Sequence, residues 1–141
     1  MPMLVNGIRI LSVVVVKNDG HVLACPGFDT IKGSNFYRLI GGGVEFNEDS
    51  LTALKREIRE ELDLELENYR LLSVLENIFV YNGNSGHEIC FVYEAEFKDK
   101  TNYKRKSFEI LDGDKAFQAI WVEMTEENKK KVFPGGASDL L

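Results

Sequence analysis

Three glutamates in one short segment could together hold a metal ion. Glu57, Glu60 and Glu61 lie three and four residues apart, so on a helix their carboxylates would share one face. Carboxylate oxygens are the ligands that hard divalent cations prefer. The arrangement opposes helix stability, because Glu57 and Glu61 are a like-charge i,i+4 pair and all three lie toward the negative end of the helix dipole. For the glutamates alone, a solvated acidic face is the simpler alternative.

The spacing of neighbouring residues extends this pattern over residues 42–64. The positions that define it are Gly42, Glu48, Arg56, Glu57, Ile58, Glu60, Glu61 and Leu64. The segment closely resembles the signature of the Nudix hydrolases, the family that includes MutT. That signature is Gly, five residues, Glu, seven residues, Arg-Glu, an aliphatic residue, any residue, Glu-Glu, any residue, Gly and a final aliphatic residue. A pattern of this length, with two paired-acid elements at fixed offsets, is far more specific than a single glycine-rich loop.

One position departs from the signature. Asp63 stands where the family usually has Gly after the helix. A residue in the left-handed conformation at a helix end favours Gly, although Asp and Asn tolerate it better than most residues. We expect a slightly less favourable helix exit and no loss of chemistry, because position 63 carries no reacting group.

The resemblance implies a hydrolase that cleaves a nucleoside diphosphate linked to another moiety, such as a nucleoside triphosphate, ADP-ribose or a nucleotide sugar. It implies that the three glutamates bind Mg²⁺, or alternatively Mn²⁺, which can activate water and neutralise a leaving phosphate. A backbone carbonyl at Gly41 or Gly42 would help, because no side chain blocks close approach there. Glu57 is also the candidate that orients or deprotonates the water, and an acid outside the segment is the alternative base.

Glu48 and Arg56 have a supporting role by the same resemblance. In the family, these two positions form an internal ion pair that braces the loop against the helix. The alternative for Glu48 is a simple acid at the helix entry, where the helix dipole favours a negative charge.

Several residues outside the segment are candidates for an extra acid or for substrate binding. By the same resemblance, an extra metal ligand or base could come from Glu109, Asp112 or Asp114, although an acidic turn explains the last two equally well. Arg38 precedes the glycines and could contact phosphate. Tyr81 could stack on a base, and Glu88, at the start of a strand beside a histidine, is a further candidate for the extra acid or for substrate binding. For Tyr81 the alternative is a place in the core, and for Glu88 it is a structural hydrogen bond.

The remaining sequence predicts strands around one main helix, an α+β pattern. Asp49 or Ser50 caps that helix, which runs to about Leu62. We expect residues 26–34 to be irregular, the glycines at 41–43 to mark a bend, and residues 98–115 to form a polar loop. A short helix should follow the Thr125 cap and run to residue 131. The predicted strands are 8–17 paired with 21–24 as a hairpin, 36–40, 69–81 paired with 88–97 across an 82–86 turn, and 117–124.

Composition sets the wider frame. The chain has 141 residues, of which 44% are hydrophobic, and this fits a single domain over residues 1–141. The resemblance implies the Nudix fold, an α/β/α sandwich with a mixed, largely antiparallel central sheet. The net charge of −6 argues against a nucleic-acid partner, which would require a basic surface. A monomer and a homodimer are equally compatible with these features.

The cysteines and the apolar runs indicate a cytoplasmic protein without a membrane partner. Two cysteines, Cys25 and Cys90, lack the short spacings of a zinc site. The first seven residues lack the basic and apolar regions of a secretory signal. The longest apolar run, residues 11–16, is far too short to span a membrane.

Two function classes therefore compete. The first is a metal-dependent pyrophosphohydrolase with a small, nucleotide-type substrate. The second is a non-catalytic Nudix-fold module that binds a nucleotide or regulates another protein. The complete set of acidic positions in residues 42–64 favours the enzyme, because a binding module does not need every metal carboxylate.

Overall fold

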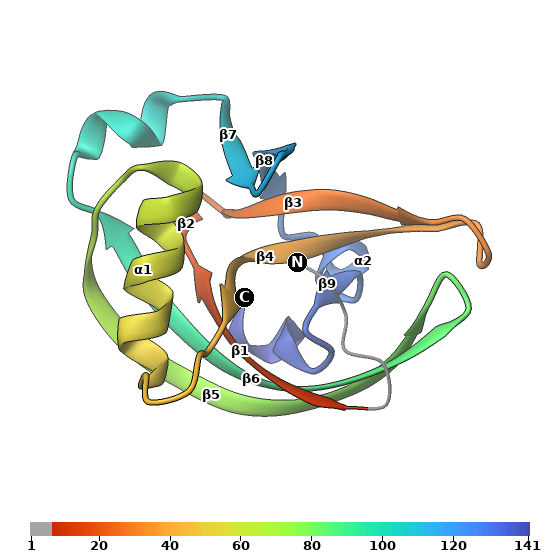
Figure 1. The fold of residues 1–141 in the computed structure, drawn as a ribbon. Helices are drawn as coiled ribbons and strands as arrows, with labels where there is room; N and C mark the ends of the chain where they lie inside the picture. Colours follow the sequence, from red (N-terminus) through yellow and green to blue (C-terminus); the bar gives the residue numbers. More distant parts are fainter. Residues whose placement is uncertain (1–6) are drawn as a thin grey trace.

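The computed structural model describes residues 7–141, whose strands form one nine-stranded mixed sheet (Figure 1). The strands are β1 (Ile8–Val15), β2 (Lys17–Asn18), β3 (His21–Asp29), β4 (Ser34–Gly43), β5 (Leu66–Tyr81), β6 (Asn84–Phe97), β7 (Ser107–Asp112), β8 (Lys115–Glu123) and β9 (Val132–Phe133). The main order is β5-β6-β1-β4-β3-β8-β7, with β2 beside β3 and β9 beside β4. The β1–β6 and β4–β9 pairs are parallel, whereas the other pairs are antiparallel. The α+β class and the mixed, largely antiparallel sheet are confirmed.

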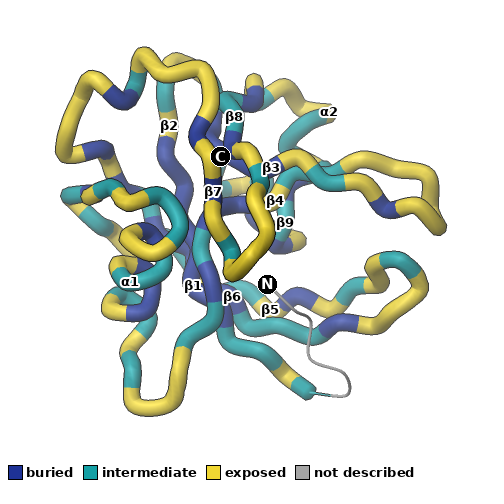
Figure 2. The backbone as a smooth tube through the Cα atoms, turned by 45° about the horizontal axis from the view of Figure 1, so that its top comes forward, coloured by how far each residue is buried: buried dark blue, intermediate teal, exposed yellow. Residues whose placement is uncertain are grey.

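Two hydrophobic cores lie on opposite faces of the sheet. Side chains alternate along β1, so Val14 enters one core and Val13 the other. Helix α1 (Ser50–Leu62) covers the first core with Leu54 and Ile58. The second core is covered by the chain after β8, which contains the short helices α2 (Glu126–Lys129) and η2 (Ala137–Leu140) with β9 between them. Figure 2 shows the buried residues concentrated where β1 and β6 cross the centre.

An aspartate caps each end of helix α1. Of the two candidate caps, Asp49 is the one used, because its carboxylate accepts a hydrogen bond of 2.8 Å from the Thr52 backbone N–H. At the other end Asp63 is left-handed, with φ 52° and ψ 43°, and its N–H donates to the carbonyl of Arg59. The predicted helix is confirmed, and so is the strained residue at its exit.

Replacing Asp63 with Gly should stabilise the protein without changing its chemistry. Gly adopts the left-handed conformation without a Cβ penalty, so we expect the free energy of unfolding to rise by about 0.5–1 kcal/mol. Denaturant titration measures this change. Asp63→Ala is the control, which should lower the stability instead. A destabilised Asp63→Gly variant would contradict this view of the helix exit.

The first predicted hairpin is mostly wrong. Only β2 pairs with the start of β3, around the left-handed turn at Asp19 and Gly20. Strand β1 instead lies between β4 and β6. It is apolar on both faces, which suits a central strand with a core on each side.

Parts of three segments expected to be irregular form strands. Pro26 and Gly27 extend β3 and pair with β4, and the glycines at 41–43 continue β4 beside β1. Residues 107–112 form β7, in which Phe108 and Ile110 are buried and alternate with exposed residues. The rest of the expected loop contains the short helix η1 (Lys100–Lys104). The predicted 82–86 turn is only Asn82 and Gly83, and the helix expected to reach residue 131 ends at Lys129.

Within residues 7–141, no helix is both long and apolar enough to cross a membrane. Residues 1–6, for which no secretory signal is expected, lie outside the part of the chain that the structure describes.

Candidate active site

The carboxyl group of Glu57 rests against the backbone of Gly42. Helix α1 packs on β4, and a Cβ at position 42 would overlap this carboxyl group. The Glu57 side chain is only 16% exposed. Glycine at position 42 therefore lets a carboxylate of the helix reach the backbone of the neighbouring strand.

Glu61 lies one helical turn after Glu57 and shares its surroundings. Burial, together with the hydrogen-bonded and negatively charged Glu57, raises the pKa of Glu61 from 4.5 to about 9, and nearby Asp112 adds to this effect while Arg38 opposes it. Two carboxylates in this position repel each other unless a proton or a cation lies between them. Their oxygens, with the backbone carbonyls of β4 nearby, fit a hard divalent cation.

Glu60 points elsewhere. Its side chain is 59% exposed and lies 3.4 Å from Nη1 of Arg56. Among residues 7–141, no three acidic, histidine or cysteine side chains come together as a ready metal-binding group. The structure thus brings Glu57 and Glu61 together and leaves Glu60 beside Arg56, so a metal-binding role for Glu60 stays a prediction.

The ion pair expected between Glu48 and Arg56 is present. Arg56 donates from Nε and Nη2 to the two oxygens of Glu48, each at 2.8 Å. It also donates at 3.0 Å to the Gly43 carbonyl and at 3.0 Å to Oε1 of Glu57. Arg56 therefore connects the loop before the helix, the end of β4 and the carboxylate of Glu57, and it fixes the orientation of that carboxylate.

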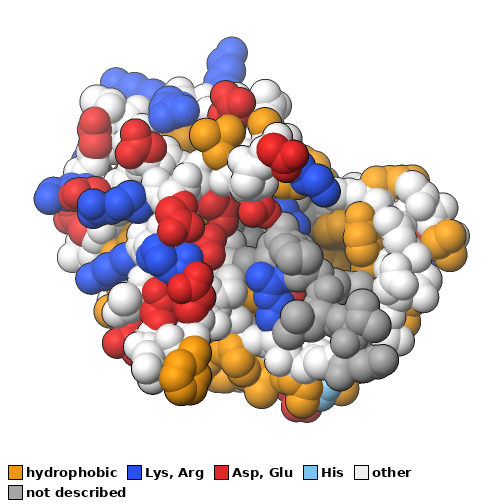
Figure 3. Space-filling view, in the orientation of Figure 1, with side chains coloured by type: hydrophobic (Ala, Val, Ile, Leu, Met, Phe, Trp, Pro, Cys, Tyr) orange, Lys and Arg blue, Asp and Glu red, His pale blue; other side chains and the backbone are white. Residues whose placement is uncertain are grey.

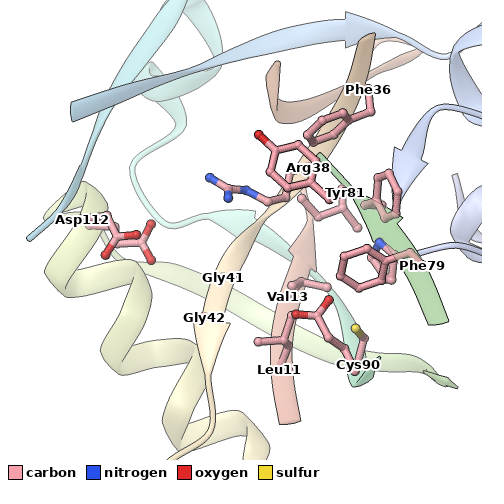
Figure 4. Close-up of a pocket in the computed structure, with 15 residues that line it drawn as sticks. Leu11, Val13, Phe36, Arg38, Gly41, Gly42, Phe79, Tyr81, Cys90 and Asp112 are labelled. Carbon is pink, nitrogen blue, oxygen red and sulfur yellow. The ribbon is translucent and has the colours of Figure 1, made fainter. Parts of the chain in front are cut away.

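A cavity of about 230 Å³ lies beside these groups and has two chemically different ends. Figure 4 shows Asp112 on one side, the rings of Phe36, Tyr81 and Phe79 on the other, and Gly41, Gly42 and Arg38 between them. Figure 3 shows acidic side chains gathered on the face that carries α1. The residues that line the ionic end are Gly41, Gly42, Glu61, Asp112 and Arg38, and the aromatic rings are Phe36, Phe79, Tyr81 and Phe133.

Of the candidates outside residues 42–64, some line this cavity and others do not. Arg38, Tyr81 and Glu88 line it, as does Asp112. Glu109 is exposed on β7 and Asp114 is exposed in the turn that follows, and neither lines the cavity. The structure therefore places one of the three possible extra acids next to Glu61.

Comparison with known proteins is consistent with this geometry. A sequence model of the NUDIX domain matches residues 8–138. The chain belongs to the NUDIX family. Among solved structures, it resembles a MutT NUDIX hydrolase from Burkholderia pseudomallei, with 26% identity and a TM-score of 0.61 over 84% of this chain and 85% of that one. NUDIX membership makes the protein a hydrolase that acts on pyrophosphate bonds.

Two more distant structures share the NUDIX fold. A MutT protein from Bacillus halodurans is 18% identical, with a TM-score of 0.59 over 94% of this chain and 78% of that one. A NUDIX hydrolase from Nitrosomonas europaea is 15% identical, with a TM-score of 0.59 over 90% of this chain and 81% of that one. At these identities the likeness concerns the fold alone.

Two residues of this NUDIX site carry little sequence signal. Phe133 lies in β9, which has only two residues and is too short for a recognisable strand pattern. Arg9 lies opposite Glu88 in the β1–β6 pairing, and its guanidinium passes over Gly43, where a Cβ would be 3.0 Å from Nη2. Burial lowers the pKa of Arg9 against the attraction of Glu88 and Glu57. These positions depend on which distant strands become neighbours, as in the β1–β6 and β4–β9 pairs, and local sequence does not show this.

The ion pair between Glu48 and Arg56, which we call the brace, should make the stability of this NUDIX hydrolase depend on pH. Hydrogen bonds from Arg56 lower the pKa of Glu48 from 4.5 to about 2. A carboxylate with a lowered folded pKa contributes stability above about pH 4.5, and this contribution is lost as the pH falls toward 2. Thermal unfolding at several pH values should therefore show Glu48→Gln melting below wild type at pH 7, with the difference shrinking between pH 4.5 and 2.

Glu45→Gln is the matched control for this brace. Glu45 is 72% exposed and lies 3.9 Å from the same arginine, so its removal should have little effect at any pH. A melting-temperature difference for Glu48→Gln that stays constant from pH 7 to pH 2 would contradict the proposed ion-pair contribution.

Proposed function

We propose that this NUDIX hydrolase uses Mg²⁺, or Mn²⁺ in its place, to cleave the pyrophosphate of a nucleoside diphosphate linked to another moiety. One observation carries the proposal: a single cavity joins an ionic end beside the Glu57 and Glu61 carboxylates to an aromatic end. A nucleoside diphosphate has the same division, because its phosphates are charged and its base is flat and aromatic.

The aromatic end suits a base. Aromatic rings provide surfaces on which a base stacks, and they tolerate different bases because every base has a π-face. Arg38 lies between the two ends and could hold a phosphate oxygen through its guanidinium. Glu88 lines the same cavity and could accept hydrogen bonds from the substrate.

At the ionic end, Glu57, Glu61 and the carbonyl of Gly41 or Gly42 would hold the cation, and Glu60 could join them by turning from Arg56. The cation, when bound, would supply charge for the phosphate oxygens and acidify water. Glu57 is the proposed base. In that step the water oxygen bonds to phosphorus, its proton passes to the Glu57 carboxylate, and the bridging P–O bond breaks.

The other side chains orient these groups. Arg56 holds Oε1 of Glu57 at 3.0 Å, and Glu48 holds Arg56 in turn. Asp112, beside Glu61, is the alternative base outside residues 42–64. Glu48 is not proposed as the base, because its carboxylate already accepts hydrogen bonds from Arg56 and from the backbone N–H of Glu45.

A substrate screen tests this function. Nucleoside triphosphates, ADP-ribose, nucleotide sugars and dinucleotide polyphosphates are incubated with the protein, with and without Mg²⁺, and the products are separated. We expect at least one compound to be hydrolysed at its pyrophosphate only when metal is present. If no compound is cleaved while one raises the melting temperature, the protein is a binding module instead.

A further inference from the structure

The two hairpins that carry the aromatic rings are joined at their ends. Figure 1 shows the β3–β4 and β5–β6 hairpin ends on the same side of the molecule. Thr30 donates from its backbone N–H and its hydroxyl to Oδ1 of Asn82, at 2.8 and 3.1 Å. In return, the Asn82 backbone N–H donates to Oδ2 of Asp29 at 3.1 Å. Lys32 Nζ adds a bond of 2.8 Å to the carbonyl of Val80. We call these four bonds the hairpin latch.

Asp29 is built into its own hairpin as well as into the latch. Its side chain is buried, with a residue exposure of 4%. Its Oδ1 accepts from the backbone N–H groups of Ile31 and Lys32, at 3.0 and 2.9 Å. A carboxylate that accepts several backbone N–H bonds is held firmly in one orientation. Asp29 therefore presents its second oxygen to Asn82 from a fixed position.

The latch closes a region that the sheet leaves open. Strand β1 separates β4 from β6, yet it pairs with β4 only between Ile40 and Gly43. On its other side, β1 begins its pairing with β6 at His87. Residues 34–39 therefore continue past the Val14 end of β1, and residues 84–86 lie before its Ile8 end, so both segments project beyond the strand without pairing with it. Among residues 7–141, the sheet pairings do not join these two projecting ends, and the latch does.

The aromatic rings are mounted on the same projecting ends. Phe36 lies across Gly27 and Phe79 lies across Gly86, which are their partners in the strand pairing. A Cβ at either glycine would overlap the ring, so each ring is set by the glycine opposite it. Phe133 contacts both rings edge-on, with centroids 5.3 and 5.6 Å apart.

Tyr81 links the rings directly to the latch. It precedes Asn82 in the chain, and its ring meets Phe36 edge-on at 5.6 Å. Phe36 belongs to one hairpin and Tyr81 to the other, so this contact depends on the separation of the two hairpin ends. Without the latch, the rings would have to be ordered when a ligand binds, and that ordering weakens binding.

We propose that Asp29 and Asn82 are positioning residues that set the width of the aromatic end and make it selective for ligands with a flat aromatic base. This inference rests on the proposed function of the cavity. The latch itself lies at the hairpin ends, and it acts through the rings of Phe36 and Tyr81. Its loss should affect the base and leave the binding of the phosphates unchanged.

Asn82→Gly tests the latch. Asn82 has a φ of 48°, a conformation that Gly adopts freely, so the turn is kept while the side chain is removed. Calorimetry with Mg²⁺ measures the Kd of two kinds of probe. The α,β-methylene analogues of ADP and GDP carry a base and resist hydrolysis, whereas methylenediphosphonate has no base. We expect Asn82→Gly to weaken the nucleoside analogues by about fivefold and to leave the base-free probe within twofold.

Two further variants provide a matched control and a second, milder disruption of the latch. Asn84→Ala is the matched control, because Asn84 flanks the same turn and its amide donates to the Asn82 carbonyl within that turn. It should bind both kinds of probe as wild type does. Thr30→Val removes one latch bond and keeps the shape of the side chain. Its effect should have the same direction and be about twofold, which covers the case in which Asn82→Gly does not fold.

The outcomes separate this inference from the proposed function. Equal weakening of both kinds of probe, or no change in either, would overturn the inference and leave only a structural role. The inference would also be contradicted if the wild-type protein bound the nucleoside analogues no more tightly than methylenediphosphonate. Hydrolysis is assayed on the same preparations with the substrates of the screen. Absent hydrolysis with a base-selective effect of Asn82→Gly would refute the proposed reaction and support the latch.

Discussion

Replacing Glu57 with Gln should lower kcat by about 10³-fold or more. Gln keeps the size of the side chain but removes its charge, so the variant loses both a cation ligand and the proposed base. General-base catalysis alone typically contributes 10²–10⁴-fold. Glu57 lies against Gly42 and accepts a hydrogen bond from Arg56, so its carboxylate is held in one position at the site. Steady-state kinetics at saturating Mg²⁺ and substrate measure the loss.

The Glu57 result requires a control for charge. Glu65→Gln removes an acid that is 58% exposed just after the helix and pairs with Lys98 and Arg59. This change should leave kcat within twofold, and both variants should melt close to wild type. A Glu57→Gln variant that keeps more than a tenth of the wild-type kcat would show that the reaction does not depend on this carboxylate.

The second large effect is expected from a single methyl group at Gly42. The Cβ of Ala would occupy the place of the Glu57 carboxyl group, which is the end of a flexible side chain and can move away. A displacement of about 1 Å can cost about 10²-fold in rate. We therefore expect Gly42→Ala to lower kcat by about 10²-fold with little change in melting temperature. Kinetics and thermal unfolding of the same preparation check both parts.

Gly41→Ala is the informative contrast. At position 41 φ is 155°, and a Cβ would overlap the backbone carbonyl of Ser12 on β1, which cannot move freely. This variant should lose stability, whereas Gly42→Ala should lose mainly activity. In a Glu57→Gln background, Gly42→Ala should cost almost nothing more, because the displaced group is already inactive. If the losses of activity from Gly42→Ala and Glu57→Gln were additive in the double variant, Gly42→Ala would not act by displacing the Glu57 carboxylate.

Local features of the fold were predictable from the sequence. Helix α1 has an apolar stripe, an Asp cap and an unusual residue at its exit, and each depends only on neighbouring residues. Asp49 and Asp63 therefore take the expected positions. The resemblance of residues 42–64 to the Nudix signature likewise implied the pairing of Glu48 with Arg56, which the structure contains.

The strands were harder to predict, because pairing depends on residues far away in the chain. Gly27 and Gly41 lie in strands since an aromatic ring covers one and the β1 backbone approaches the other. Propensity alone assigns both glycines to turns. Strand β7 has the alternating pattern of Phe108 and Ile110, which the many charged residues of its surroundings hide.

The same limit applies to the candidate site. Helical geometry predicts that Glu57, Glu60 and Glu61 share a face, but not which of them turns toward Arg56. The closeness of Glu61 to Asp112, and the bonds between Asp29 and Asn82, join segments that the sequence separates widely. Such contacts follow from sheet order and register rather than from local patterns.

The central claim is that Glu57 and Glu61 hold a divalent cation against the end of β4. Crystals of the wild-type protein soaked in MnCl₂ and measured at the manganese absorption edge test it directly. The predicted result is an anomalous peak bounded by the Glu57 and Glu61 carboxylates and the carbonyl oxygen of Gly41 or Gly42, and its absence from Glu57→Gln crystals. Manganese bound only at other acidic groups, with none at this position, would contradict the claim.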